Sequence, residues 1–343
     1  MITKIIAEDA IQKTKKYISN VDKIVIVTHT SPDGDAIGSS LGMYHFLEEM
    51  DKQVNIIVPN SFPDFLLWMK GAGSIINYEK SPDIATETID AAELIFCLDF
   101  NHPKRIGNLA PLIRNAEAKK ILIDHHLDPE QFCDVTMSYP LISSTSEMIF
   151  RIICRMGFFE LINKACAESV YTGMMTDTGA FTFNSNNEEI YYIISELLKK
   201  GIDKDAIYSK VYHAYSADRI RLMGFITYKN MRIYKQYKTA LLTLSKAEQF
   251  RFRMRKGDTE GFVNIPMSIG DVVFSVFIRE DDDVIRLSFR SKGQFPCNEF
   301  AAAHFGGGGH RNAAGGEFHG SLADAIALFE SVIPQYQNLL EKN

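Results

Sequence analysis

The chain has 343 residues, a formal net charge of −6, 46% hydrophobic residues, 23% charged residues and five cysteines. This length suits two domains, and the composition is that of an ordinary globular protein. No apolar run approaches the ~20 residues that span a bilayer, and the N-terminus lacks the features of a secretory signal. We therefore expect a cytoplasmic protein with no membrane partner, whose odd number of widely spaced cysteines are free thiols.

The charge distribution argues against duplex DNA as a partner. Residues 1–230 hold 23 basic and 30 acidic side chains, whereas residues 231–343 hold 14 and 13. A protein that binds a double helix needs a basic face over the phosphates, and the sequence indicates none. A small anionic substrate that is handled through bound cations agrees better with this balance.

Apolar strands and helical patterns alternate through the first half of the chain. The predicted strands are Lys23–Val27, Gln53–Val58, Leu94–Leu98 and 120–123. Helical spacing precedes the first strand over 3–19 and follows it over 36–50, and later helices are expected over 144–154 and 164–175. Because strands that are apolar on both faces are typical of parallel sheets, we predict an α/β fold whose N-terminal lobe holds a mostly parallel sheet flanked by helices.

The second half of the chain changes from helices to strands. Helical stretches over 188–200, 204–211 and 217–228 are followed by strands over 239–244, 272–278 and 284–289, a helix over 298–304 and a closing helix from Ser321. This pattern predicts a smaller C-terminal α/β lobe with a mixed sheet. We place the N-terminal domain at 1–190, a helical linker at 191–230 and the C-terminal domain at 231–343.

Polar residues follow three of the predicted strands at the point where each strand ends. His29, Asp33 and Asp35 follow the first strand, in a stretch where Pro32 and Gly34 predict a turn. The other candidates are Asp99 after the third strand, Asp124, His125 and His126 after the fourth, and Asp177 after helix 164–175. In open α/β sheets ligands bind at the carboxyl ends of the strands, so we expect one shared site there.

A metal site is the simplest explanation for this gathering of acids. Carboxylates that lie close together raise one another's pKa unless cations intervene. Carboxylate oxygens with a minority of imidazoles suit manganese or magnesium better than zinc. Two such ions about 3.5 to 4 Å apart form the usual clamp for in-line attack on phosphorus.

The glycine run at 306–309 has a separate physical argument. Four glycines weaken both helix and strand, so they predict a loop where the backbone comes close to a ligand. Exposed N–H groups in such a loop can hold an anion, although a merely flexible loop is the alternative. The run is followed by His310 and Arg311, and a strand with Arg290 and Ser291 near its end precedes it.

These motifs, in this order, resemble the DHH phosphoesterase superfamily. The pattern consists of H-x-x-x-D-x-D from His29, an Asp that ends a strand, D-H-H from Asp124, D-T-G from Asp177 and G-G-G-G-H ending at His310. The resemblance covers about Val21 to Phe318 and includes the DHH-associated C-terminal domain. It is closest to the group of bifunctional oligoribonucleases (nanoRNases) and 3′-phosphoadenosine-5′-phosphate (pAp) phosphatases.

The resemblance implies roles for the metal-site residues. His29 and Asp33 would bind one ion, Asp35, His125 and Asp177 the other, and Asp99 both. The cofactors would be two Mn²⁺, with Mg²⁺ as the alternative, and a hydroxide that bridges them would attack phosphorus. His126 would contact the substrate phosphate and stabilise or protonate the leaving oxygen, and Asp124 would orient a histidine.

The resemblance also implies substrate contacts. Arg290, Ser291, Gly308, Gly309, His310 and Arg311 would bind phosphate or base. Arg105 matches an arginine that some relatives place near the phosphate, with an ordinary surface arginine as the alternative. Thr182 stands where a number of relatives carry a basic residue, so the resemblance does not determine the exact phosphate contacts or the substrate preference.

We therefore expect a manganese-dependent phosphodiesterase that hydrolyses short single-stranded RNA to mononucleotides and releases the 3′ phosphate of pAp. Linear dinucleotides from cyclic-dinucleotide turnover and inorganic polyphosphate are alternative substrates, and a non-catalytic nucleotide-binding regulator is an alternative class. All the expected metal ligands are present, which favours the enzyme. The oligomeric state stays open, with a homodimer as one candidate.

Overall fold

The chain folds into two compact units. The structure is a computed structural model that describes residues 3–342, and the division between the units falls after Ala214. Helices α7 (Glu188–Lys199) and α8 (Lys204–Tyr212) belong to the N-terminal unit, and α9 (Ala217–Phe225) begins the C-terminal unit. The predicted linker at 191–230 is therefore shared between the units, and the functional division of the chain stays a prediction.

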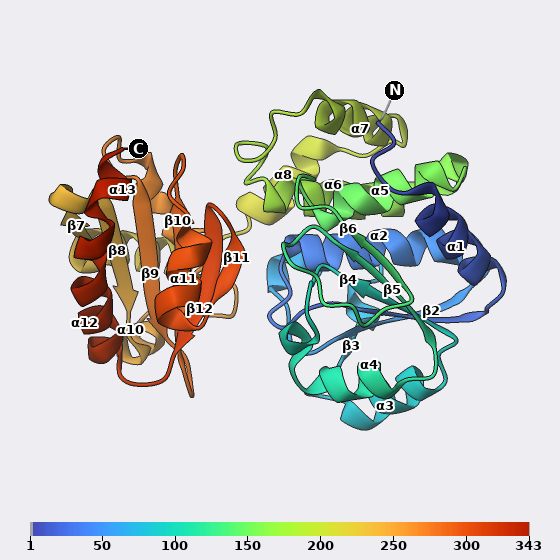
Figure 1. Cartoon of the computed structure of the whole chain (residues 1–343), viewed down its shortest axis with the longest axis horizontal. Helices are drawn as coiled ribbons and strands as arrows, with labels where there is room; N and C mark the ends of the chain where they lie inside the picture. Colours follow the sequence, from blue (N-terminus) through green and yellow to red (C-terminus); the bar gives the residue numbers. More distant parts are fainter. Residues whose placement is uncertain (1–2, 343) are drawn as a thin grey trace. The chain divides into compact units, whose positions relative to one another are not determined.

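A six-stranded sheet in the order β3-β2-β1-β4-β5-β6 forms the centre of the N-terminal unit, and all its pairs are parallel (Figure 1). The strands are β1 (Lys23–Val27), β2 (Gln53–Val58), β3 (Ile76–Asn77), β4 (Leu94–Leu98), β5 (Lys119–Asp124) and β6 (Val135–Ser138). The predicted parallel sheet is confirmed. The short edge strands β3 and β6 were missed, because a strand of two to four residues carries too little periodicity to recognise.

Helices cover both faces of this sheet, as Figure 1 shows. One core contains α1 (Glu8–Ser19), α2 (Gly34–Glu48), α5 (Thr145–Arg155) and α6 (Lys164–Asp177). The other contains α3 (Pro82–Asp90), α4 (Ala110–Asn115) and the 3-10 helix η3 (Pro103–Leu109). Along β1, Ile24 and Ile26 enter the first core and Val25 and Val27 the second, which is why this strand is apolar throughout.

Glycines let α2 and α6 pack at unusually short range. Gly34, Gly38 and Gly42 recur every four residues and so form one stripe of α2. A Cβ at Gly34 would lie 2.2 Å from Thr176 Oγ1, and one at Gly38 would lie 2.7 Å from the backbone nitrogen of Gly173. This close packing brings the start of α2 near the end of α6, where Asp35 and Asp177 lie.

The C-terminal unit holds a mixed sheet in the order β11-β12-β10-β9-β8-β7, in which only β8 and β9 are parallel. Its strands are β7 (Arg232–Tyr234), β8 (Thr239–Leu244), β9 (Phe274–Glu280), β10 (Ile285–Ser291), β11 (Gly308–His310) and β12 (Ala313–Phe318). Its further helices are α10 (Lys246–Arg251), α11 (Cys297–Phe305), α12 (Leu322–Val332) and α13 (Gln337–Glu341). The predicted mixed sheet is confirmed.

Phenylalanines dominate the core between this sheet and its helices. Phe274 of β9, Phe289 of β10 and Phe300 of α11 are fully buried and contact one another, and Phe329 of α12 packs on Phe300. Burial of large aromatic side chains is the main stabilising term for such a small sheet. Among residues 3–342, no helix has the length and apolar character needed to cross a membrane.

Candidate metal centre

The carboxyl ends of β1, β4 and β5 lie side by side and carry the candidate ligands. His29 and Asp33 follow β1, Asp99 follows β4, and His125 and His126 follow β5, which ends at Asp124. From β1 the chain continues to β2 and β3 on one side of the sheet, and from β4 it continues to β5 and β6 on the other side. Open α/β sheets bind ligands at such a switch point.

Asp35 lies in a helix, and the predicted turn is wrong at this position. Helix α2 begins at Gly34, directly after Asp33, whose side chain accepts hydrogen bonds from the N–H groups of Asp35 and Ala36, each at 3.1 Å. The glycine is tolerated because it occupies the first turn, and the capping Asp33 compensates for its weak helix propensity. Asp33 and Asp35 therefore leave the backbone in different directions.

Asp99 stands between two groups of donor atoms. Its Oδ2 lies 3.4 Å from Nε2 of His29, and its Oδ1 lies 3.6 Å from Nε2 of His125. The backbone of Asp99 is left-handed, with a φ of 63°, a conformation that Asp tolerates better than most residues. The two oxygens of one carboxylate thus face two different histidines.

Each group contains one histidine and two carboxylates. The first consists of His29, Asp33 and Asp99, with Nε2 of His29 3.9 Å from Oδ1 of Asp33. The second consists of Asp35, His125 and Asp177, with Nε2 of His125 3.9 Å from Asp35 and 3.5 Å from Asp177. Within each group the donor atoms lie within 4.8 Å of one another. The sequence predicted all these residues, and the structure brings them together.

The donor set fits divalent cations. The separations of 3.4 to 3.9 Å exceed most N–H···O hydrogen bonds, so the donor atoms surround shared space. Nδ1 of His29 lies 2.8 Å from the carbonyl oxygen of Thr30, and Nδ1 of His125 lies 3.2 Å from that of Ile142. These contacts favour a proton on Nδ1 and turn Nε2 toward the carboxylates, as in most metal-binding histidines.

Without cations the centre retains protons. Burial raises the pKa of Asp35 well above its usual range, and the charges of Asp99 and Asp177 raise it further. Burial lowers the pKa of His125, but Asp177, Asp99 and Asp35 outweigh this effect and raise it to about 9. Burial also acts to raise the pKa of Asp99. The hydrogen bond and the charge of His29 outweigh this effect and hold the pKa of this carboxyl well below its usual range. Cations would replace these protons.

His126 is oriented by Asp124. Its Nδ1 donates to Oδ1 of Asp124 at 2.7 Å, and its backbone N–H donates to Oδ2 at 3.0 Å. Burial lowers the pKa of His126, although Asp124 opposes this shift. The positive charge of the half-buried Arg105 acts on the centre, because it adds to the effect of burial in lowering the pKa of His126 and opposes the net rise in the pKa of His29.

A segment that was not predicted from the sequence, Ile142–Ser146 at the start of α5, also contacts the centre. The N–H groups of Thr145 and Ser146 donate to Asp35 at 2.6 and 2.9 Å, and the Thr145 hydroxyl donates to Asp99 at 2.9 Å. A serine followed three residues later by Glu147 is a known signal for a helix start. That signal predicts where a helix begins, but it does not indicate which residues of the chain contact the start of the helix.

In the C-terminal unit, Arg290 and His310 lie on one face of the sheet. Both pair in register with Ala313 of β12, from opposite sides, and paired residues point to the same face. The buried side chains of β10 alternate with Arg290, so this face lies opposite the phenylalanine core. Gly308, Gly315 and Ser288 form the next row on the same face, so this part of the face, over β11, β12 and β10, carries only small side chains in that row.

The second half of the glycine run is a strand and not a loop, which corrects the prediction for Gly308 and Gly309. Gly308, Gly309 and His310 form the edge strand β11. A Cβ at Gly307 would lie 1.9 Å from the carbonyl oxygen of Gly315, and Gly309 has a φ of 142°. Glycine is therefore required by close backbone packing within the sheet.

Ser291 and Arg311, which were also predicted to contact the substrate, lie in different environments. Ser291 is buried, and its hydroxyl donates to the carbonyl oxygen of Phe295 at 2.7 Å and accepts from Asn312, which indicates a structural contribution. Arg311 is exposed, and its carbonyl oxygen accepts from the N–H of Cys297. Roles of Arg290, Ser291, Gly308, Gly309, His310 and Arg311 in substrate binding stay predictions.

Comparison with known protein families agrees with this geometry. Residues 23–174 match the N-terminal domain of the DHH family, and residues 239–335 match the DHHA1 domain. The chain belongs to the DHH family. The first matched domain lies within the N-terminal unit and the second within the C-terminal unit.

Two relatives of this DHH protein cover nearly its whole length. The bifunctional oligoribonuclease and PAP phosphatase NrnA of Bacillus subtilis is 28% identical over 89% of this chain and 92% of its own. The crystal structure of an exopolyphosphatase-related protein from Bacteroides fragilis is 56% identical, with a TM-score of 0.94, and the match covers 99% of this chain and 100% of that chain.

A more distant structure shares the fold of this DHH protein. The crystal structure of exonuclease RecJ bound to manganese has a TM-score of 0.52 and is 13% identical, and the match covers 96% of this chain and 94% of that chain. At this identity the likeness is one of fold.

Proposed function

We propose that this DHH protein is a manganese-dependent phosphodiesterase that hydrolyses short oligoribonucleotides to mononucleotides and removes the 3′ phosphate of pAp. The observation that carries the proposal is Asp99, whose two oxygens face His29 and His125 at 3.4 and 3.6 Å. One carboxylate between two ligand groups is suited to two ions. The name of the B. subtilis relative supports these substrates, and the manganese in RecJ supports the choice of ion.

The chain's own residues would divide the work as follows. His29 and Asp33 would hold one ion, Asp35, His125 and Asp177 the other, and Asp99 both. When bound, two divalent ions neutralise phosphate charge and make water a stronger nucleophile near neutral pH. The deep burial of Asp35 and Asp99 strengthens their attraction to cations, because the local dielectric constant is low.

His126 would act on the phosphate and the leaving oxygen. Burial favours its neutral form, and Asp124 favours the charged form by accepting the Nδ1 hydrogen. A substrate phosphate nearby would add negative charge and so favour the protonated ring, which can then stabilise or protonate the leaving oxygen. Arg105 would add positive charge on the same side, since its charge already acts on His126.

The C-terminal unit would supply binding of the nucleotide. Arg290 and His310 lie in one row across the sheet with Ala313 between them, and Gly308, Gly315 and Ser288 form the next row on the same face. A flat row of small residues beside two cationic or hydrogen-bonding side chains suits a planar base or a phosphate. This arrangement supports a small nucleotide or short RNA as the substrate.

Polyphosphate is the second candidate, because the B. fragilis relative is described as exopolyphosphatase-related. Polyphosphate needs cationic groups but no surface for a base. Linear dinucleotides are a third candidate with the same metal chemistry. A non-catalytic regulator would be expected to lack at least one candidate ligand, whereas all six candidate residues are present and grouped.

The deciding experiment compares these substrates in parallel. End-labelled RNAs of a few nucleotides, pAp, a linear dinucleotide and polyphosphate are incubated with the protein in Mn²⁺ and in chelator. We expect turnover of RNA and pAp that requires Mn²⁺ and is reduced by about 100-fold or more in His126→Ala. Turnover of polyphosphate or the dinucleotide alone would replace the proposed substrates, and no turnover at all would favour the regulator.

A further inference from the structure

The segment Ile142–Ser146 contacts three of the six candidate metal ligands. The carbonyl oxygen of Ile142 accepts from His125, and Thr145 donates to both Asp35 and Asp99. The carbonyl group of Ile142 and the N–H and hydroxyl groups of Thr145 neither titrate nor bind metals in the proposed reaction. Neither the family match nor the relatives' names assigns them a role. The contacts lie in a fully buried environment, since Thr145, Ser146 and Asp35 are at most 1% exposed.

Thr145 is the residue that joins the two ligand groups. Its backbone N–H donates to Oδ2 of Asp35 at 2.6 Å, and its hydroxyl donates to Oδ1 of Asp99 at 2.9 Å. The N–H of Ser146 donates to the other oxygen of Asp35 at 2.9 Å. Asp35 is thus held at both oxygens and cannot rotate without breaking a hydrogen bond.

We propose that Thr145 is a positioning residue of the metal centre, which fixes the carboxylates of Asp35 and Asp99 relative to each other so that two ions can bind. The proposal rests on the proposed function of the centre as a site for two cations. An ionised carboxylate oxygen has more than one lone pair, so each oxygen that accepts from Thr145 can still bind an ion. Ligand carboxylates that are hydrogen-bonded in turn bind metals more tightly, because less freedom is lost on binding.

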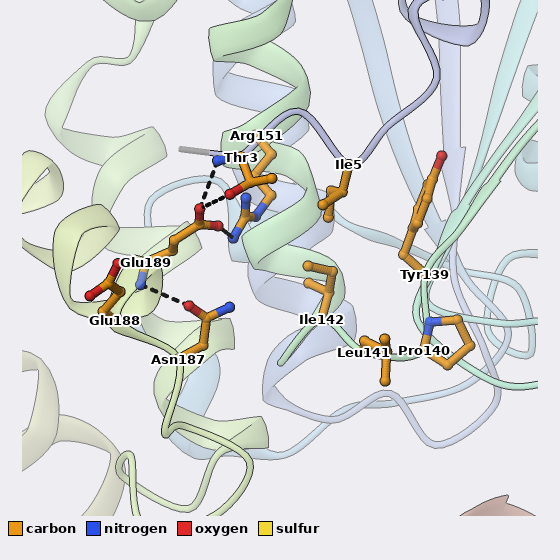
Figure 2. A pocket seen from close by; sticks show the side chains of 10 residues that line it. All are labelled: Thr3, Ile5, Tyr139, Pro140, Leu141, Ile142, Arg151, Asn187, Glu188 and Glu189. Carbon is orange, nitrogen blue, oxygen red and sulfur yellow. Dashed lines mark hydrogen bonds and ion pairs between the residues drawn. The ribbon is translucent and has the colours of Figure 1, made fainter. Parts of the chain in front are cut away.

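Contacts with other residues hold the first turn of α5 in place. Glu147 accepts from the N–H and hydroxyl of Ser143 through Oε2 and pairs with Arg151 through Oε1. Figure 2 shows that Arg151 also pairs with Glu189 of α7, next to a pocket that Ile142 lines. The segment is therefore anchored by contacts other than those with the candidate ligands, as a rigid support for ligands requires.

A purely structural contribution is the competing explanation. Thr145 is the first residue of α5, and the preceding Ser144 caps the helix by accepting from the N–H of Glu147 at 3.0 Å. If the hydroxyl of Thr145 only stabilised the fold, its loss would change thermal stability and leave metal affinity unchanged. The two explanations therefore differ in a binding measurement that does not involve substrate.

The test compares three variants of the full chain. Thr145→Val removes the hydroxyl and keeps the shape, and Thr145→Ser keeps the hydroxyl. The matched control is Thr14→Val in α1, which removes a fully buried hydroxyl that has no hydrogen-bond partner among residues 3–342. Titration with Mn²⁺ by calorimetry and by electron paramagnetic resonance gives the number and affinity of bound ions, and scanning calorimetry checks that each variant is folded.

We expect Thr145→Val to weaken Mn²⁺ binding by about 10- to 100-fold, with near wild-type affinity in Thr145→Ser and Thr14→Val. In turnover assays, raising Mn²⁺ should restore part of the activity of Thr145→Val without changing KM for the substrate. Wild-type affinity in a folded Thr145→Val would overturn the proposal, as would equal impairment of Thr145→Ser or a wild-type protein that binds no Mn²⁺. If the wild type binds two ions but hydrolyses none of the substrates, the proposed function fails while the titration still decides the role of Thr145.

Discussion

Gly38 of α2 lies so close to α6 that a methyl group on it would sit 2.7 Å from the backbone nitrogen of Gly173. In turn, a Cβ at Gly173 would lie 1.9 Å from Oγ of Ser146 and 2.8 Å from Oδ1 of Asp35. Backbone packing between two helices therefore determines where Asp35, one of the candidate metal ligands, lies. The geometry of the candidate centre depends on glycines that carry no chemistry of their own.

We predict that Gly38→Ala destabilises the N-terminal unit by about 1–3 kcal/mol, because α2 and α6 must move apart to admit the methyl group. Gly73→Ala is the control, since a Cβ at that exposed glycine meets nothing within 4 Å. Scanning calorimetry of the full chain should show a lower melting temperature for Gly38→Ala alone. Equal melting temperatures for both variants would contradict the close packing described here.

The gathering of the candidate metal ligands could be predicted from the sequence, whereas the residues that support them could not. His29, Asp99 and His125 each follow an apolar strand, and parallel strands bring their carboxyl ends together. The contacts of Thr145 with Asp35 and Asp99 join residues more than forty positions apart, and no local pattern predicts them.

The strand β11 and the helical position of Asp35 were predicted wrongly for a related reason. Local rules treat glycine as a breaker, but Gly34 is stabilised by the cap that Asp33 provides and Gly308 by pairing with β12. Tertiary contacts override propensity at both positions.

We predict that Asp99→Asn abolishes binding of at least one of two Mn²⁺ ions and lowers turnover by about 100-fold or more, because an amide cannot supply a shared anionic ligand. Asp22→Asn is the control at the opposite end of β1, where the side chain is 80% exposed. The measurements are Mn²⁺ stoichiometry and hydrolysis of short RNA. Two tightly bound ions in Asp99→Asn would show that Asp99 is not the shared ligand.

We predict that Arg290→Ala raises KM for short RNA and pAp by about 10-fold while kcat changes less, because it removes a charge-assisted contact to phosphate. Arg286 provides the matched control, since it lies on the same face of β10 but pairs with Asp281 and Glu317 at 2.8 Å. Steady-state kinetics on both variants give the comparison. A larger KM effect for Arg286→Ala would place the substrate elsewhere on the unit.

We predict that Glu189→Gln lowers stability at pH 7 by about 1–2 kcal/mol, because it weakens the ion pair with the buried Arg151. Burial opposes the charge of Glu189, but hydrogen bonds from Thr3 and Arg151 hold its pKa below the usual value of 4.5. A lowered folded-state pKa contributes stability above the unfolded-state pKa, and this contribution is lost as pH falls through the folded-state value.

The melting-temperature difference between wild type and Glu189→Gln should therefore be constant from pH 7 to about 5.5 and shrink below about 4.5. Glu188→Gln, at the neighbouring exposed position, is the control and should follow the wild type throughout. A difference that persists unchanged into acid would mean that Glu189 acts through packing and not through its charge.

We predict that Mn²⁺ binds more tightly as pH rises from 6 to 9 and that binding releases protons. Burial lowers the pKa of His125, but the carboxylates around it raise it to about 9, and His29 is raised above its usual value by Asp99 in spite of its burial. His125 therefore carries a proton on Nε2 in the metal-free protein at neutral pH, which a metal must displace in order to bind there, and the raised pKa of His29 acts in the same direction. Calorimetric titration in buffers of different ionisation enthalpy measures the number of protons released. An affinity that is independent of pH, with no proton release, would contradict histidine ligation in both groups, because each imidazole that holds a proton before binding must lose it to become a ligand.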